Sequence, residues 1–163
     1  MVNFVQGYSI FDHDADLYVV TVNLVGVMGA GVAKAFRERH PKLFQQYRKD
    51  CRNGVLSIGW PMVYQGPDNK RYMMFPTKDN WRGRSQIPWV IAGLEWMVDN
   101  AGSEFPTTDR IVMPPLGCGN GKLPWYAVSQ IIYELCGQLP NPVTAVAPPW
   151  QYQDTYRPHC TDI

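Results

Sequence analysis

Several stretches of the chain have the apolar pattern of buried or edge strands. Residues 17–22 form a continuous rather than an alternating apolar run, which is typical of a strand covered on both faces. Shorter strands are predicted at residues 110–113 and 143–146, and residues 1–5 are expected to form an edge strand. Residues 55–60 and 71–75 are predicted to pair as strands around a turn at 65–69.

Four helices are predicted between these strands. The first runs from residue 31 to about residue 39, and Pro41 ends it and begins the second, since proline is tolerated in the first turn of a helix. Ser85 is the predicted N-cap of a third helix, in which apolar residues recur at i, i+3, i+4 and i+7. Pro124 begins the fourth. The alternation of strands and helices along the chain favours a single domain, residues 1–163, of the three-layer α/β/α class.

Two glycine-rich segments follow predicted strands. The first glycine loop, residues 24–32, follows the strand at 17–22, and the second glycine loop, residues 114–123, follows the strand at 110–113. Glycine permits positive φ and lets backbone amides approach an anion, and a helix N-terminus adds partial positive charge. Two such loops in one small domain predict a ligand with two phosphates.

Neither loop fits a common nucleotide-binding motif. The first has Lys34 where a dinucleotide-binding fold requires glycine, and Asp50 follows a second helix instead of the next strand. The second contains Gly121 and Lys122 without the Ser or Thr that holds magnesium in a P-loop. For each loop taken alone, a tight turn without a ligand is the alternative.

Three side chains beside the loops are candidates for chemistry. Lys78 ends an apolar strand, where a partly desolvated amine can lose its proton and act as nucleophile or base; the alternative is a solvated lysine. Asn23 ends the strand before the first loop, where a ligand contact and a turn or cap role are both open. Cys118 is better interpreted as a small residue that lets the loop curl than as a nucleophile, because no histidine lies near a strand end.

Composition narrows the class of protein. A net charge of +1 with 18% charged residues argues against a surface that holds duplex nucleic acid by charge alone. No apolar stretch is long enough to span a membrane, and no signal peptide is evident, so a cytoplasmic protein is expected. The histidines lack metal-ligand spacing, so neither a metal nor a cofactor is predicted. The cysteines are widely spaced and predict reduced thiols: Cys51, Cys118, Cys136 and Cys160.

Three blocks of residues in order resemble a macrodomain, and within that family the DarG-type DNA ADP-ribosyl glycohydrolases, which are related to terminal ADP-ribose protein glycohydrolase. The blocks lie at residues 21–31, 75–82 and 115–125. The resemblance implies a mixed sheet between helices, with ADP-ribose across the strand ends. It implies that Asn23 lies at the distal ribose and that glycohydrolysis depends on Lys78, through a transient imine or assisted departure of the base. The implied ligand-binding residues are Gly29, Ala30, Gly31, Val32, Leu116, Gly117, Cys118, Gly119, Asn120, Gly121, Trp81 and Trp150.

The sequence departs from the family pattern at three places. Many macrodomains have Gly-Asp near the first strand, with the aspartate at the adenine, and here Tyr8 stands there, so Tyr8, Trp150 or Tyr152 is expected to stack on the base. The protein-directed relative has an aspartate where this chain has Gly121, which favours a lysine-only mechanism. DarG continues into a region that binds its toxin, whereas this sequence ends at Ile163, so a free-standing macrodomain is expected and toxin binding is not assumed. The resemblance itself implies an antitoxin-like protein.

The expected activity is removal of ADP-ribose from a nucleobase, thymidine, in single-stranded DNA by a monomeric enzyme. Arg82 and Arg84 are candidates for contacts with the DNA backbone, although exposed arginines are commonly only solvated. Two alternatives are open: a module that binds ADP-ribose or a related nucleotide signal without turnover, and a hydrolase of protein-linked ADP-ribose.

Overall fold

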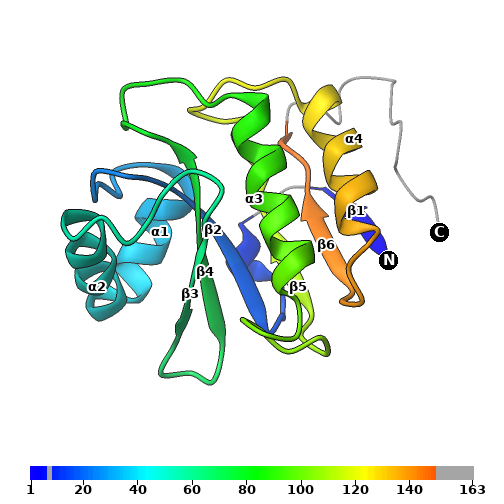
Figure 1. Cartoon of the computed structure of the whole chain (residues 1–163), viewed down its shortest axis with the longest axis horizontal. Helices are drawn as coiled ribbons and strands as arrows, with labels where there is room; N and C mark the ends of the chain where they lie inside the picture. The colour runs from blue at the N-terminus through cyan, green and yellow to red at the C-terminus, as the bar shows by residue number, and fades with distance from the viewer. Residues whose placement is uncertain (7–8, 150–163) are drawn as a thin grey trace.

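A computed structural model of the chain describes residues 1–6 and 9–149. Six strands form one sheet in the order β1-β6-β5-β2-β4-β3, with helices on both faces (Figure 1). None of the described helices is both long and apolar enough to cross a membrane. The elements, in chain order, are β1 (Val2–Val5), the 3-10 helix η1 (Ile10–Asp12), β2 (Leu17–Asn23), α1 (Gly31–Arg39), α2 (Pro41–Arg52), β3 (Met62–Gln65), β4 (Arg71–Lys78), α3 (Ile87–Asn100), β5 (Ile111–Met113), α4 (Trp125–Cys136) and β6 (Val143–Val146).

The sheet is mixed, as the family resemblance implied. Strand β2 pairs in parallel with β4 on one side and β5 on the other, and β6 continues the parallel arrangement to β1 at the edge. Only β3, at the opposite edge, runs antiparallel to its neighbour β4. Because the carboxyl ends of β2, β4 and β5 meet at one edge of the sheet, the segments that follow them gather there.

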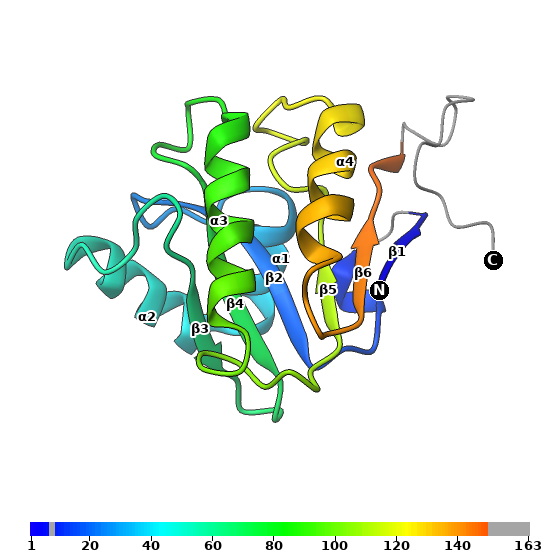
Figure 2. The ribbon, with the colours of Figure 1, turned by 45° about the vertical axis from the view of Figure 1, so that its right-hand side comes forward.

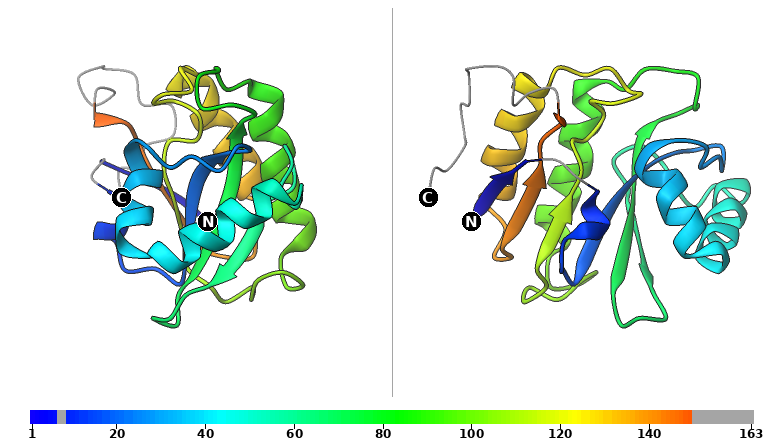
Figure 3. Two further views of the ribbon diagram at one scale, coloured as in Figure 1. Left: turned by 90° about the vertical axis from the view of Figure 1, so that its left-hand side faces the viewer. Right: turned by 180° about the vertical axis from the view of Figure 1, so that it is seen from behind.

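Two apolar cores cover the two faces of the sheet. Leu17 and Val19 of β2 face the core under α3 and α4, which lie side by side over one face (Figure 2). Val20 and Val22 face the other core, which contains residues of α1 and α2 (Figure 3). Burial on both sides explains why the β2 sequence is apolar throughout, and it confirms the predicted three-layer α/β class.

Two local predictions were wrong. Residues 55–60 contain only an isolated bridge between Ser57 and Trp60, because Gly59 turns the chain with φ +77°, and the partner of β4 begins at Met62. Ser85 does not cap α3: Gln86 occupies the N-cap position without a side-chain hydrogen bond, and the helix begins at Ile87. A proline in the first turn favours this start, since its missing N–H would have no partner there.

Candidate ligand-binding site

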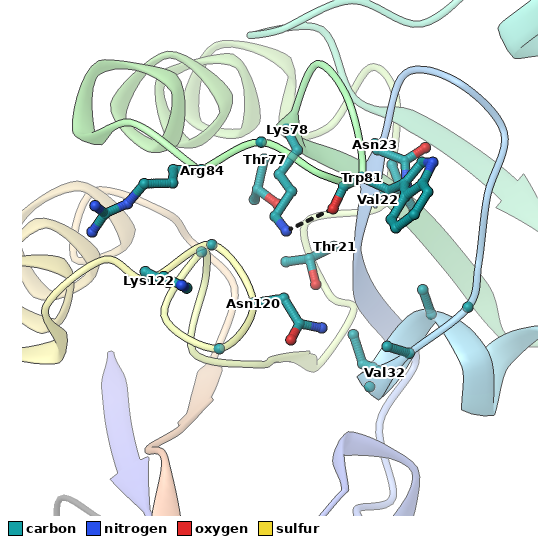
Figure 4. Close-up of a pocket in the computed structure, with 18 of the residues that line it drawn as sticks. Thr21, Val22, Asn23, Val32, Thr77, Lys78, Trp81, Arg84, Asn120 and Lys122 are labelled. Atoms are coloured by element: carbon teal, nitrogen blue, oxygen red, sulfur yellow. Dashed lines mark hydrogen bonds between the residues drawn. The ribbon is translucent and has the colours of Figure 1, made fainter.

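A cavity of about 700 Å³ lies at the carboxyl ends of β2, β4 and β5 (Figure 4). Both glycine loops, the end of β4 and the loop that follows it form its walls. Its lining residues are Thr21, Val22, Asn23, Val27, Gly29, Ala30, Gly31, Val32, Ala33, Thr77, Lys78, Trp81, Arg82, Gly83, Arg84, Pro114, Pro115, Gly117, Gly119, Asn120, Gly121 and Lys122.

The first glycine loop is built around the side chain of Asn23, which is buried at the end of β2. Its Oδ1 accepts hydrogen bonds from the backbone N–H groups of Val25 at 3.1 Å and Val27 at 3.3 Å. Its Nδ2 donates to the Val27 carbonyl oxygen at 2.8 Å. The structure therefore shows the turn role for this residue, and one N–H of Nδ2 is left for another partner.

Helix α2 supports Asn23 from behind through Tyr47, which is fully buried. The Tyr47 hydroxyl donates to the Asn23 carbonyl oxygen at 2.6 Å and lies 3.1 Å from its Oδ1. Burial raises the pKa of Tyr47 above its ordinary value, so the hydroxyl keeps the proton that it donates. The first loop thus depends on a residue 24 positions along the chain.

The N-terminus of α1 opens on the same cavity. Gly31, with φ +58°, begins the helix, and Ala30 occupies the N-cap position, where it supplies no side-chain hydrogen bond. The N–H groups of the first turn therefore have neither an intrahelical nor a capping partner. A helix start of this kind is suited to an anionic ligand.

The second glycine loop is held by backbone hydrogen bonds and close packing. The N–H of Leu123 donates to the Gly117 carbonyl oxygen at 2.9 Å, and the N–H of Ser85 donates to the Gly121 carbonyl oxygen at 3.1 Å. A Cβ on Gly121 would lie 2.2 Å from the Ser85 Oγ and 2.4 Å from the Gly117 carbonyl oxygen. No side chain fits at position 121 with this backbone.

Leu116 and Cys118 lie in the core beneath the second loop instead of on the cavity wall. The Cys118 Sγ donates to the Leu116 carbonyl oxygen at 3.6 Å, and burial raises the pKa of this thiol to about 12. A thiol that stays protonated is a poor nucleophile. This placement favours the interpretation of Cys118 as a small residue that fits the curl of the loop.

Lys78 ends β4 directly beside the end of β2, where it is the register partner of Asn23 across a β-bulge. Its Nζ donates to the Trp81 carbonyl oxygen at 3.3 Å, as the dashed line in Figure 4 shows. Partial burial and, secondly, the positive charge of Lys122 lower the pKa of Lys78 from its ordinary value. More of this amine is therefore deprotonated near neutral pH than in a solvated lysine.

The structure brings most of the predicted site residues together and adds others. Of the predicted ligand-binding set, all the described residues except Leu116 and Cys118 line the cavity, while Tyr8, Trp150 and Tyr152 lie outside the described residues. Thr21, which is not among the predicted site residues, also lines it, two positions before Asn23 on β2. Within the described ranges, no group of three His, Cys, Asp or Glu side chains is arranged to hold a metal.

Comparisons with known proteins give a consistent result. A family model described as Macro domain matches residues 19–132. A DNA ADP-ribosyl glycohydrolase of Mycobacterium tuberculosis is 38% identical over 141 residues, which covers 83% of this chain and 39% of that protein. The macrodomain of Thermus aquaticus DarG aligns with a TM-score of 0.82 and 38% identity, covering 91% of this chain and 99% of that one.

A third similar protein was solved with a ligand. Thermosipho africanus DarTG in complex with ADP-ribose aligns with a TM-score of 0.82 and 30% identity, covering 90% of this chain and 41% of that one. The chain spans less than half the length of the curated relatives that it matches, between 39% and 44% of each.

Proposed function

This chain belongs to the Macro domain family, and on that basis we propose that it hydrolyses the bond between ADP-ribose and a nucleobase, thymidine, in single-stranded DNA. The family that the sequence blocks resembled is thereby confirmed, whereas the reaction is our proposal. Two findings support this reaction. Three curated relatives at 37–38% identity are named DNA ADP-ribosyl glycohydrolase, and the similar structure from Thermosipho africanus is a complex with ADP-ribose.

The diphosphate of the ligand would lie between the two glycine loops. The uncapped first turn of α1 and the backbone of residues 29–32 supply N–H groups on one side, and residues 117–121 form the opposite wall. Neither loop presents a carboxylate to the cavity, so an anion meets no repulsion there. Asn23 would orient the distal ribose through the Nδ2 hydrogen that the loop does not use.

The Lys78 amine would then act at C1″ of that ribose. In one route it attacks C1″, the sugar ring opens, the base leaves with a proton, and water hydrolyses the imine to return the amine and free ADP-ribose. In the other route the amine assists departure of the base and water attacks C1″ directly. The lowered pKa of Lys78 suits the first route, because nucleophilic attack requires an uncharged amine, whereas in the second route the ammonium form would donate a proton to the departing base.

The observation that carries the proposal is the meeting of the Lys78 amine with both glycine loops in one cavity. The test is release of ADP-ribose from an ADP-ribosylated oligonucleotide. Lys78→Ala should abolish release, while Lys42→Ala, an exposed lysine of α2 outside the cavity lining, should leave the rate unchanged. No release by the wild type, or equal release by the Lys78 variant, would contradict the proposal.

A module that only binds ADP-ribose is the second candidate, because no acidic side chain of residues 1–6 or 9–149 lines the cavity to assist proton transfer. Two measurements separate the candidates: calorimetry with ADP-ribose, and turnover assays with ADP-ribosylated DNA and with protein that carries ADP-ribose through an ester bond. A binder gives heat with ADP-ribose and leaves every substrate intact. A protein-directed hydrolase releases ADP-ribose from the ester alone.

We further propose an antitoxin-like role, as a monomer in the cytoplasm. One relative, from Thermosipho africanus, is named as a fusion of a DNA ADP-ribosyl transferase with a DNA ADP-ribosyl glycohydrolase. In that protein the name assigns attachment of ADP-ribose to DNA to one part and its removal to the other. This pairing supports a role for the present chain in reversing the reaction of such a transferase. Cells whose growth is stopped by a DNA ADP-ribosyl transferase should grow again when this chain is co-expressed. Co-expression of its Lys78→Ala variant should not restore growth.

A further inference from the structure

The charge of the cavity exceeds what ADP-ribose requires. Its lining contains four cationic side chains and no Asp or Glu among the residues that the structure describes, although the whole chain has a net charge of only +1. The diphosphate carries about two negative charges and, in the proposed function, is held by backbone amides. The four cations are Lys78, Arg82, Arg84 and Lys122. Even with Lys78 uncharged, as the nucleophilic route uses it, three cations remain against the diphosphate, and a further anion would balance this surplus.

The surplus comes mainly from one segment of the chain. Three of the cations belong to the end of β4 and the loop before α3, and Lys122 belongs to the second glycine loop. None of them forms a salt bridge among the described residues. The neighbouring acid, Asp79, instead accepts a hydrogen bond from the N–H of Asn80 at 2.7 Å through its Oδ1.

An exposed aromatic side chain stands beside these cations. Trp81 lines the cavity but remains 48% exposed, and the Arg82 guanidinium lies 4.6 Å from the centroid of its ring. The Trp81 carbonyl oxygen accepts the hydrogen bond from Lys78, so the indole belongs to a residue held at the reacting amine. In Figure 4, Trp81 and Arg84 lie on opposite sides of Lys78.

An aromatic ring among unpaired cations is the arrangement that proteins use for single-stranded nucleic acid: bases stack on the ring, and the cations follow the backbone phosphates. An acidic peptide would be attracted by the charges alone and would gain nothing from stacking on the exposed indole. The combination therefore favours a nucleotide acceptor over a peptide acceptor. A base must also be unpaired to stack on the indole, which favours single strands over duplex DNA.

We propose that residues 81–84, together with Lys122, form the acceptor subsite: Trp81 stacks on the base that carries ADP-ribose, and Arg84 and Lys122 contact the phosphates beside it. This inference rests on the proposed function, in which the bond at C1″ joins ADP-ribose to a nucleobase. It assigns recognition of the acceptor to the loop before α3 and recognition of ADP-ribose to the glycine loops.

Binding measurements in the Lys78→Ala background test the subsite without turnover. The probes are ADP-ribose, a single-stranded oligonucleotide with one ADP-ribosylated thymidine, the corresponding nucleoside, and an ADP-ribosylated peptide. Trp81→Ala should weaken oligonucleotide and nucleoside binding roughly 5- to 100-fold, the range expected for loss of one stacked base, while Trp81→Phe retains most of the affinity. Affinity for ADP-ribose should change less than about twofold, since the glycine loops are untouched.

Arg84→Ala should act on the oligonucleotide alone. Its loss should lower the slope of log affinity against log salt by about 0.7, the value for one phosphate contact on a single strand. The matched controls are Trp60→Ala and Arg52→Ala, an exposed tryptophan and an exposed arginine outside the cavity lining, and both should leave all affinities unchanged.

The subsite proposal is overturned if the Trp81→Ala and Trp60→Ala variants bind the oligonucleotide equally. It is also overturned if the peptide binds the protein as tightly as the oligonucleotide does and if Trp81→Ala weakens peptide binding too. Thermal melting of each variant separates loss of the subsite from loss of the fold. If the wild type releases no ADP-ribose while Trp81→Ala still weakens oligonucleotide binding, the hydrolase proposal fails and the subsite stands.

Discussion

The two glycine loops face each other across one cavity but are held in opposite ways. The first is organised from inside by a polar side chain: Asn23 makes three hydrogen bonds to its backbone, and Tyr47 fixes Asn23 from α2. Among its described side-chain hydrogen bonds the second has only the long one from the Cys118 thiol to the Leu116 carbonyl oxygen, and it is shaped by backbone contacts and by the absence of Cβ at Gly117 and Gly121. The first loop should therefore be disturbed by substitutions that remove a hydrogen-bonding group. The second should be disturbed by substitutions that add side-chain atoms.

The largest effect is expected from adding one methyl group to the second loop. In Gly121→Ala, the new Cβ would overlap the Ser85 Oγ and the Gly117 carbonyl oxygen, and the backbone atom cannot move without breaking the loop. We expect a loss of about 3 kcal/mol in the free energy of unfolding, measured by urea denaturation, and loss of measurable ADP-ribose binding by calorimetry.

Gly119→Ala is the matched control in the same loop. An added Cβ at Gly119 meets no atom within 4 Å, and its φ is not positive, so stability should change little. If Gly119→Ala and Gly121→Ala were equally destabilised, close packing would not be what shapes the second loop.

A smaller effect is expected from removing one hydroxyl behind the first loop. Tyr47→Phe keeps the buried ring but leaves the Asn23 carbonyl oxygen with only the Cys51 thiol, at 4.0 Å, as a donor, which costs about 1–2 kcal/mol. Because Asn23 then loses its anchor, the affinity for ADP-ribose should also fall. Tyr64→Phe is the control: it removes a buried hydroxyl that donates to Asp50, so it should lower stability and leave ADP-ribose affinity intact.

The sequence was sufficient to predict the strands that lead into the two glycine loops and the residues that follow them. Apolar runs identified β2 and β5, and glycine and polar residues directly after strands identified both loops, Lys78 and Asn23. Parallel strands bring their carboxyl ends together, so residues separated by more than 50 positions were expected at one site before any contact was known.

Contacts between elements could not be predicted in the same way. Nothing in the pattern of α2 distinguishes Tyr47 from an ordinary core tyrosine, because its role depends on how the helix is rotated against β2. Ser85 matched the residue type of an N-cap, but its N–H bonds Gly121 and its Oγ has no hydrogen-bond partner. Local rules identified which residues were suited to a role, and tertiary packing decided which of them had it.

Gly31→Ala should produce a still smaller loss in the first loop. Gly31 has φ +58°, but an added Cβ would meet nothing within 4 Å, so the cost is backbone strain alone, about 1 kcal/mol. Gly31→Asn should cost less, because asparagine tolerates this conformation better than alanine does. Thermal unfolding of the pair measures the difference. An alanine variant as unstable as Gly121→Ala would contradict the contrast between the loops.

The smallest effect concerns charge, which of the two glycine loops only the second supplies to the cavity. The positive charge of Lys122 helps to lower the pKa of Lys78, because it disfavours the protonated amine. Lys122→Asn, which suits the residue's φ of +63°, removes that charge, so the pKa of Lys78 should rise. If the neutral amine is the active form, the rising limb of the rate against pH should move to higher pH in this variant and stay in place in Lys122→Arg. High salt should move the wild-type limb in the same direction by screening the charge. A limb that stays in place, or that moves to lower pH, would show that the second loop shapes the cavity without tuning its amine.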